Sequence, residues 1–122
     1  MPPDEVLVSS EFGYFLEVLN LIRGDTPLVV SSWYRSPQHP IEAAKPHPGS
    51  HATGLAVDMS MRGDRAMEAM RIAHSRLPRN WMGIGVSQKG DTRFLHLDCA
   101  GSPMAKEVLG ERHPARPMCW SY

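Results

Sequence analysis

The segment GSHATGLAVDMS, residues 49–60, is the most informative stretch of the chain, because it carries a histidine and an aspartate with a glycine between them. His51 and Asp58 would lie roughly 23 Å apart in an extended chain and roughly 10 Å apart in a helix. Two ligands of one metal ion must bring their donor atoms within about 4 Å. The chain must therefore turn back between them. Gly54 can adopt the positive φ that such a turn often needs, and residues 55–57 predict a buried strand that carries Asp58 to the site.

The segment RFLHLDC, residues 93–99, supplies a second histidine. His96 and Asp98 are two residues apart in a β-rich run, so they project from the same face of a strand. Together, His51, Asp58 and His96 form a set of three ligands that leaves a fourth zinc position open for water. The alternatives are a histidine bonded to a carboxylate without metal and a His96 that simply packs in the core.

The remaining pattern indicates an α+β fold. Apolar residues at helical spacing predict a helix over residues 10–23, with Ser9 or Ser10 as its cap and Gly24 at its end. Strands and a second helix follow: a strand over 28–34, a helix over 63–77, and a hairpin of WMGIGVSQ and RFLHLDC. Strands separated by helices and closed by a hairpin are typical of the α+β class.

Two segments carry more detailed expectations. The helix over residues 63–77 is expected to be capped near Asp64 and to turn its apolar side inward; the residues assigned to that side are Met67, Met70 and Leu77. The proline-rich stretch 37–48 predicts a surface loop with one helical turn at 41–44.

Composition favours one compact domain over residues 1–122, since 122 residues with 42% hydrophobic content can fill one core. Thirteen basic and thirteen acidic residues give zero net charge, which argues against a nucleic-acid or an anionic-membrane partner. The N-terminus resembles no signal peptide, and no run approaches transmembrane length. Cys99 and Cys119 are expected to be reduced thiols, with Cys99 in the core rather than a fourth ligand.

These motifs resemble those of the zinc D-Ala-D-Ala peptidases, the M15-type family, whose fold is shared with lysostaphin and the Hedgehog signalling domain. The family pattern HxxGxAxD is complete here, followed by HxD: His51, Gly54, Ala56 and Asp58, then His96 and Asp98. The likeness extends to residues 31–51, 83–90 and 116–122 and is greatest for small phage and prophage peptidases. It implies a mainly antiparallel sheet of about four strands with flanking helices.

The resemblance also implies an activity. The cofactor is Zn²⁺, and the reaction is hydrolysis of a peptide bond at a D-amino acid in peptidoglycan stem peptides or cross-links, as carboxypeptidase or endopeptidase. Arg35 matches the family arginine and is expected to bind the substrate carbonyl or carboxylate in the catalytic site; the alternative is a surface salt bridge. Gly49 replaces the family serine, so Ser50 becomes the substrate-binding candidate. Arg116 and Trp120 are further candidates.

The general base departs from the family pattern. Many relatives carry an acid three residues before the last ligand, where this chain has Arg93. A carboxylate must take the proton of the attacking water. Asp98 is the first catalytic candidate, although it could instead orient a ligand imidazole. Asp91 is the reserve candidate, in a turn that could be purely structural.

The expected partner is a peptidoglycan peptide, bound by a monomer without nucleic acid or membrane. The expected localisation is synthesis in the cytoplasm without a signal peptide and action on the cell wall, from a phage or prophage gene. The alternative is a catalytically inactive zinc-binding module that binds peptidoglycan or serves in phage assembly, and Arg93 is its main support.

Overall fold

The computed structural model describes residues 2, 4–35, 38–43 and 49–122, and its strands form a single sheet. The strands are β1 (Val29–Ser32), β2 (Ala56–Ser60), β3 (Gly83–Ser87), β4 (Phe94–Asp98) and β5 (Met118–Ser121). The helices are α1 (Asp4–Leu7), α2 (Ser10–Arg23), α3 (Pro40–Ala43), α4 (Gly63–Arg76) and α5 (Pro103–Leu109), with 3-10 turns η1 (Ser50–Thr53), η2 (Arg79–Trp81) and η3 (Gly110–Arg112). None of the helices in these described ranges is long and apolar enough to cross a membrane.

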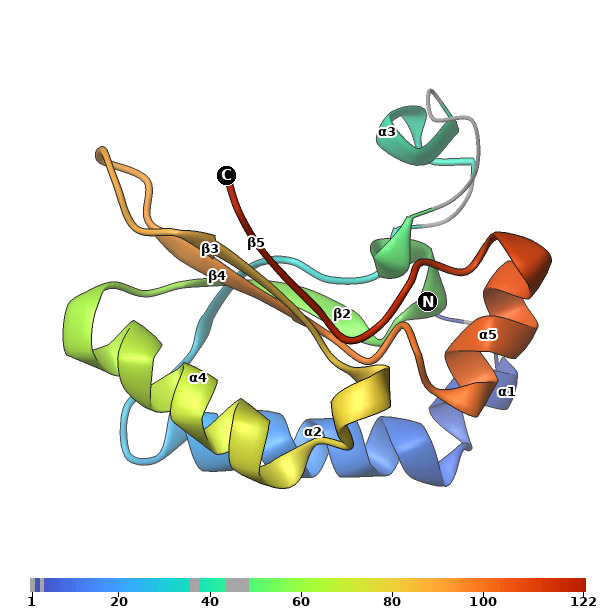
Figure 1. The fold of residues 1–122 in the computed structure, drawn as a ribbon, viewed down its shortest axis with the longest axis horizontal. Coiled ribbons are helices and arrows are strands. Elements are labelled where there is room, and N and C mark those ends of the chain that lie inside the picture. Colours follow the sequence, from blue (N-terminus) through green and yellow to red (C-terminus); the bar gives the residue numbers. More distant parts are fainter. Residues whose placement is uncertain (1, 3, 36–37, 44–48) are drawn as a thin grey trace.

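The sheet has the strand order β1-β2-β4-β3-β5 (Figure 1). Each of the pairs β1–β2, β2–β4 and β3–β4 is antiparallel, whereas β5 runs parallel to β3. The α+β class and the mainly antiparallel sheet are therefore confirmed. The described residues contain one strand more than the expected four, because the C-terminal segment joins the edge of the sheet through β3.

Two helices, α2 and α4, lie along the same face of the sheet (Figure 1). Apolar side chains of α2 and of the central strands meet there in one core. Its fully buried members include Phe15, Val18, Val57, Met59, Ile84, Leu95 and Leu97. Because side chains alternate along a strand, the residues between these core positions point to the opposite face. That opposite face carries Asp58, His96 and Asp98, and we call it the site face.

Helix α2 begins and ends as the sequence predicts. The hydroxyl of Ser9 accepts the N–H of Phe12 at 3.1 Å, which satisfies one of the free donors at the helix start. Gly24 ends the helix with φ of 54°, and its N–H donates to the carbonyl of Asn20. A positive φ suits glycine because it has no Cβ.

Helix α4 occupies the predicted segment, but two details of the prediction are wrong. Asp64 does not cap it; the first N–H, of Gly63, donates instead to Oε1 of Gln88 at 3.0 Å. Met67 points outward and is 69% exposed, whereas Leu77 is buried as expected and Met70 is partly buried. Small residues take the buried positions of α4, and they are Ala66, Ala69 and Ala73. Alanines allow α4 to approach the core closely, so the large methionine is displaced to the solvent side.

Part of the proline-rich stretch is described. The helical turn predicted at 41–44 is present as α3, one residue earlier. Residues 36–37 and 44–48, with His47, lie outside the described residues.

Candidate metal centre

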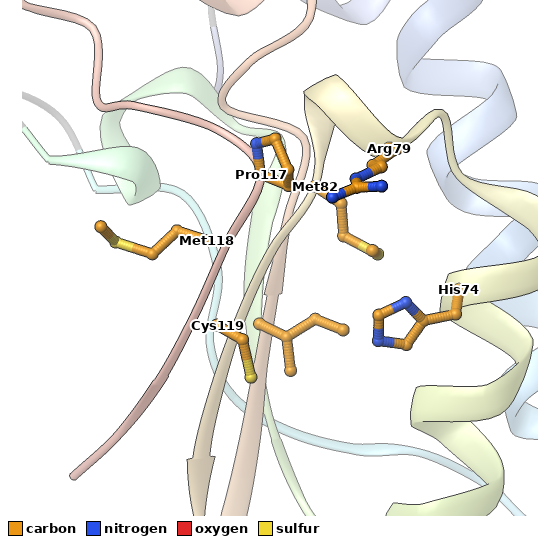
Figure 2. A pocket seen from close by; sticks show the side chains of 7 residues that line it. His74, Arg79, Met82, Pro117, Met118 and Cys119 are labelled. Atoms are coloured by element: carbon orange, nitrogen blue, oxygen red, sulfur yellow. The ribbon is translucent and has the colours of Figure 1, made fainter.

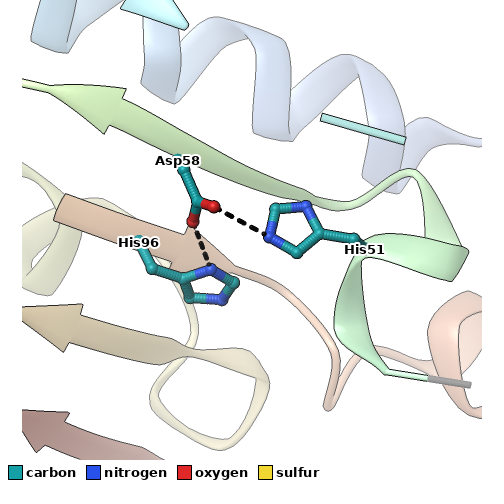
Figure 3. A group of neighbouring side chains, drawn as sticks. All are labelled: His51, Asp58 and His96. Carbon is teal, nitrogen blue, oxygen red and sulfur yellow. Dashed lines mark hydrogen bonds and ion pairs between the residues drawn. The ribbon is translucent and has the colours of Figure 1, made fainter. Parts of the chain in front are cut away.

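His51 is placed by the turn that the sequence predicts. It lies in η1, which ends at Gly54 with a left-handed φ of 79°, and the chain then enters β2. Its Nδ1 lies 2.7 Å from the carbonyl oxygen of Trp33. A carbonyl can only accept, so Nδ1 carries the proton of this contact. In the neutral imidazole the lone pair is then on Nε2, which lies 3.4 Å from Oδ2 of Asp58 (Figure 3).

Asp58 and His96 are brought together by strand pairing. They are direct partners in the antiparallel register of β2 and β4. Nδ1 of His96 lies 2.9 Å from Oδ1 of Asp58, and Nε2 of His96 lies 2.7 Å from Oδ2 of Asp98 (Figure 3 shows the first contact). The ring of His51 stands nearly perpendicular to that of His96, with centroids 5.1 Å apart.

The three predicted ligands therefore form one group. One ligand atom from each of His51, Asp58 and His96 lies within 4.8 Å of the others. Both imidazoles are buried, and the Asp58 carboxylate is mostly so. This group could hold a metal ion, because imidazole nitrogen and carboxylate oxygen are common metal donors and all three converge on one point.

The charges within the group shift its protonation equilibria. Burial alone would raise the pKa of Asp58, but the nearby imidazole of His51 and the hydrogen bond with His96 outweigh burial and hold that pKa well below its usual range. Burial alone would lower the pKa of His96, but hydrogen bonds to Asp58 and Asp98 raise it above its usual value.

Asp98 is fully buried and its carboxylate oxygens are fully engaged. Oδ1 accepts the N–H of Ala100 at 2.9 Å and Nε of Arg116 at 2.9 Å. Oδ2 accepts Nη2 of Arg116 at 2.7 Å and Nε2 of His96 at 2.7 Å. A carboxylate has about four lone-pair positions, so these four donors fill them. Burial raises the pKa of Asp98, but the donors from His96 and Arg116 lower it below its usual value. This geometry favours the orienting role for Asp98 over the general base.

The Arg116 contact is a feature that sequence reasoning missed. Arg116 precedes β5 and its side chain is 5% exposed, because it lies against Asp98 and not in solvent. Gly83 makes room for the pair: a Cβ at this position would lie 2.6 Å from Oδ2 of Asp98 and would also overlap the guanidinium. The glycines of the GIG motif at 83–85 are the only local sign of this close approach.

Arg35 lies beside the group. Its Nη2 donates to Oγ of Ser32 at 2.9 Å and is 3.9 Å from Oδ2 of Asp58. Its backbone N–H donates to the carbonyl of His51 at 3.0 Å, which fixes the two segments to each other. The salt bridge that was the alternative role for Arg35 is thus made with a candidate metal ligand. Ser50 begins η1 directly before His51 and is partly exposed.

Asp91 and two surface hollows lie apart from the group of His51, Asp58 and His96. Asp91 is exposed in the β3–β4 turn, and the first part of β4 separates it from His96. It lines a surface hollow that also contains Arg93. A second hollow lies beside β5 and α4, where Figure 2 shows His74 and Cys119 on its wall. His74 is exposed on α4 and is not part of the group.

Comparisons with known proteins add no further identification. The chain matches no protein-family model, no curated protein and no solved structure. The group of His51, Asp58 and His96 is therefore the main observation on which a function can be argued.

Proposed function

We propose that this chain is a zinc metallopeptidase that hydrolyses a peptide bond at a D-amino acid in peptidoglycan stem peptides or cross-links. The single observation that carries the proposal is the convergence of His51, Asp58 and His96, with the outer nitrogen of each imidazole held by an acceptor. Histidines that bind metals almost always have such a partner on the second ring nitrogen. The sequence resemblance to D-Ala-D-Ala peptidases supplies the substrate class.

The donor set suits zinc. Zinc prefers four-coordinate sites with ligand bonds of about 2.0–2.1 Å, which places two ligand atoms roughly 3.3 Å apart. The separation of 3.4 Å between Nε2 of His51 and Oδ2 of Asp58 is close to that value. Three protein ligands leave one position for water or substrate, as in catalytic zinc sites. Bound there, zinc would supply a Lewis acid and a water whose pKa is lowered toward neutrality.

Two further residues have distinct roles in this proposal. Arg35 binds the substrate carbonyl or carboxylate beside Asp58, since its guanidinium stays charged and can donate two parallel hydrogen bonds. Asp98 is a positioning residue that fixes the ring of His96 so that Nδ1 points into the group. Arg116 in turn holds Asp98 through two hydrogen bonds.

The test is incubation of the zinc-loaded protein with purified peptidoglycan and, separately, with a peptide that ends in D-Ala-D-Ala. Mass spectrometry of the products should show release at one bond and thereby locate it. The His51→Ala variant should release nothing. Cleavage that survives both this variant and a chelator would contradict a zinc mechanism.

A catalytically inactive zinc module that binds peptidoglycan is the second candidate. The full engagement of the Asp98 carboxylate favours it, together with Arg93 at the position of the family acid. Sedimentation of the protein with peptidoglycan, without release of any peptide over many hours, would support this alternative.

A further inference from the structure

Three aromatic side chains extend from the metal group across the site face. The ring of Trp120 lies 5.2 Å from that of His96. Tyr122 follows, 6.3 Å from Trp120 and 4.9 Å from Phe94 between ring centroids. We call Phe94, Trp120 and Tyr122 the aromatic ledge. It starts next to a candidate metal ligand and continues along β5 and β4 away from it.

The inner part of the ledge is held rigidly. A Cβ at Gly85 would lie 2.6 Å from two atoms of the Trp120 indole, so that ring lies directly on the backbone of β3. The guanidinium of Arg116 is 5.4 Å from the centroid of the same ring. A cation over an aromatic face adds attraction to this packing. Trp120 therefore has one orientation, set by a glycine and an arginine.

The outer part of the ledge is exposed and amphipathic. Tyr122 is 52% exposed, although the backbone N–H donates to Val86 at 3.1 Å and Phe94 supports the ring. Burial raises the pKa of Tyr122, and the charges of Asp58 and Asp98 add to this effect, so the hydroxyl remains a proton donor at neutral pH. Ser60 is exposed and opposite Phe94 in the strand register, which adds a second hydroxyl.

A flat aromatic surface with hydroxyls at its rim is complementary to a pyranose ring. Such a sugar has a face of C–H groups that can pack on aromatic rings, and a rim of hydroxyls that form hydrogen bonds. An apolar peptide side chain would use the rings but not the rim. A tyrosine that is apolar on its faces and polar at its tip suits a ligand of mixed character.

We propose that the aromatic ledge binds a sugar ring of the glycan to which the cleaved peptide is attached. The inference rests on the proposed function, because it takes the metal group as the place where the peptide bond is cut. It assigns the substrate as a glycan-linked peptide and not a free peptide. The sugar lies over Tyr122, and the peptide extends past Trp120 toward His96.

The first test compares two substrates of the zinc-loaded protein: a stem peptide, and the same peptide linked to its disaccharide. Wild type should cleave the linked peptide with kcat/KM about 2- to 10-fold higher, the range expected for one aromatic contact. Tyr122→Leu should bring this ratio to about one, and Tyr122→Phe should lower it only in part, because it keeps the ring and loses the rim hydroxyl. Cys119→Ser on the same strand is the matched control, because its side chain lines the hollow beside α4. An equal kcat/KM for both substrates in wild type, or an unchanged ratio in Tyr122→Leu, would overturn the inference while the peptidase function stands.

The second test measures binding in the wild-type protein and does not depend on cleavage. The N-acetylglucosamine trimer is titrated into wild-type protein, and the indole N–H signals of the three tryptophans are followed by NMR. The signal of Trp120, assigned by its loss in Trp120→Phe, should shift in a saturable way, whereas that of Trp81 on η2 should not. If neither peptide is cleaved, the peptidase proposal fails, and a saturable Trp120 shift still supports a sugar site. No shift of Trp120 at millimolar sugar would contradict the ledge as a sugar site.

Discussion

The two faces of the central strands differ in what they do. On the helix side, Met59 and Leu97 are fully buried among apolar side chains and contribute to stability alone. On the site face, Asp58 precedes Met59 in β2 and His96 precedes Leu97 in β4. Asp58 and His96 are polar and contact each other through a hydrogen bond. Because side chains alternate along a strand, one residue packs in the core and the next belongs to the candidate metal group. Substitutions on one face should therefore change stability, and substitutions on the other should change metal binding or activity.

The largest effect on stability should come from the helix side. Leu97→Ala removes a fully buried side chain and leaves a cavity, so it should lower the free energy of unfolding by about 2–5 kcal/mol. Urea denaturation measures this change. The zinc content per folded molecule should stay the same, because Leu97 points away from the site face. A loss of zinc from protein that remains folded would show that the two faces are not separate.

Arg35 should have the next largest effect, on turnover and not on metal. Arg35→Ala should reduce kcat/KM by about 10²-fold, since a charge-assisted contact near the reacting carbonyl is lost. Arg35→Lys should recover only part of this, because an ammonium cannot form the paired contact. Zinc content is measured alongside. Wild-type turnover in the alanine variant would place Arg35 outside the site.

Asp98 should affect metal affinity. Asp98→Asn removes the negative charge and replaces one acceptor oxygen by an NH2 group, so His96 is held less well, zinc affinity should fall by about 10- to 100-fold and excess zinc should restore much of the activity. Asp91→Asn, in the exposed turn, is the matched control and should change neither. Turnover that stays at least 10²-fold low in zinc-saturated Asp98→Asn would instead identify Asp98 as the general base.

The smallest effect is a pH dependence of the metal-free protein. His96 has a pKa raised above 6.5, so its contribution to stability is present below pH 6.5 and is lost as pH rises through the higher folded value. Asp58 has a pKa lowered below 3.8, so its contribution is present above pH 3.8 and is lost as pH falls further. The melting temperature should be highest between these limits. His96→Gln should flatten the decline on the alkaline side, and an unchanged profile would contradict the pairing of His96 with the carboxylates.

Local signals were sufficient for much of the fold and for the strand faces that the candidate ligands occupy, whereas the meeting of Asp58 with His96 depends on the pairing of β2 with β4. Ser9 and Gly24 cap α2 through contacts within four residues, and Gly54 takes the left-handed conformation that the return of the chain requires. His96 and Asp98 share a strand face because alternation is a property of the strand itself. Each of these features depends on residues that are close in the sequence, so it can be predicted from one sequence alone.

The features that sequence reasoning missed depend on distant partners. β5 is a short strand that pairs with β3, from which it is separated in the sequence by β4, α5 and η3. Arg116 meets Asp98 across 18 positions, and only Gly83 and Gly85 hint at the space these contacts need. Met67 was misplaced because helical spacing does not reveal that alanines take the buried side of α4.

The most direct test of the account is the zinc content of the protein. Elemental analysis of wild type, purified at neutral pH and dialysed, should give one zinc per chain. His51→Ala and His96→Ala should lose it, because two remaining ligands make a poor site. His74→Ala, an exposed histidine on α4, should retain it. Full zinc occupancy in His51→Ala or His96→Ala, or a wild type that binds no zinc at a stoichiometric concentration, would rule out a zinc site at this group.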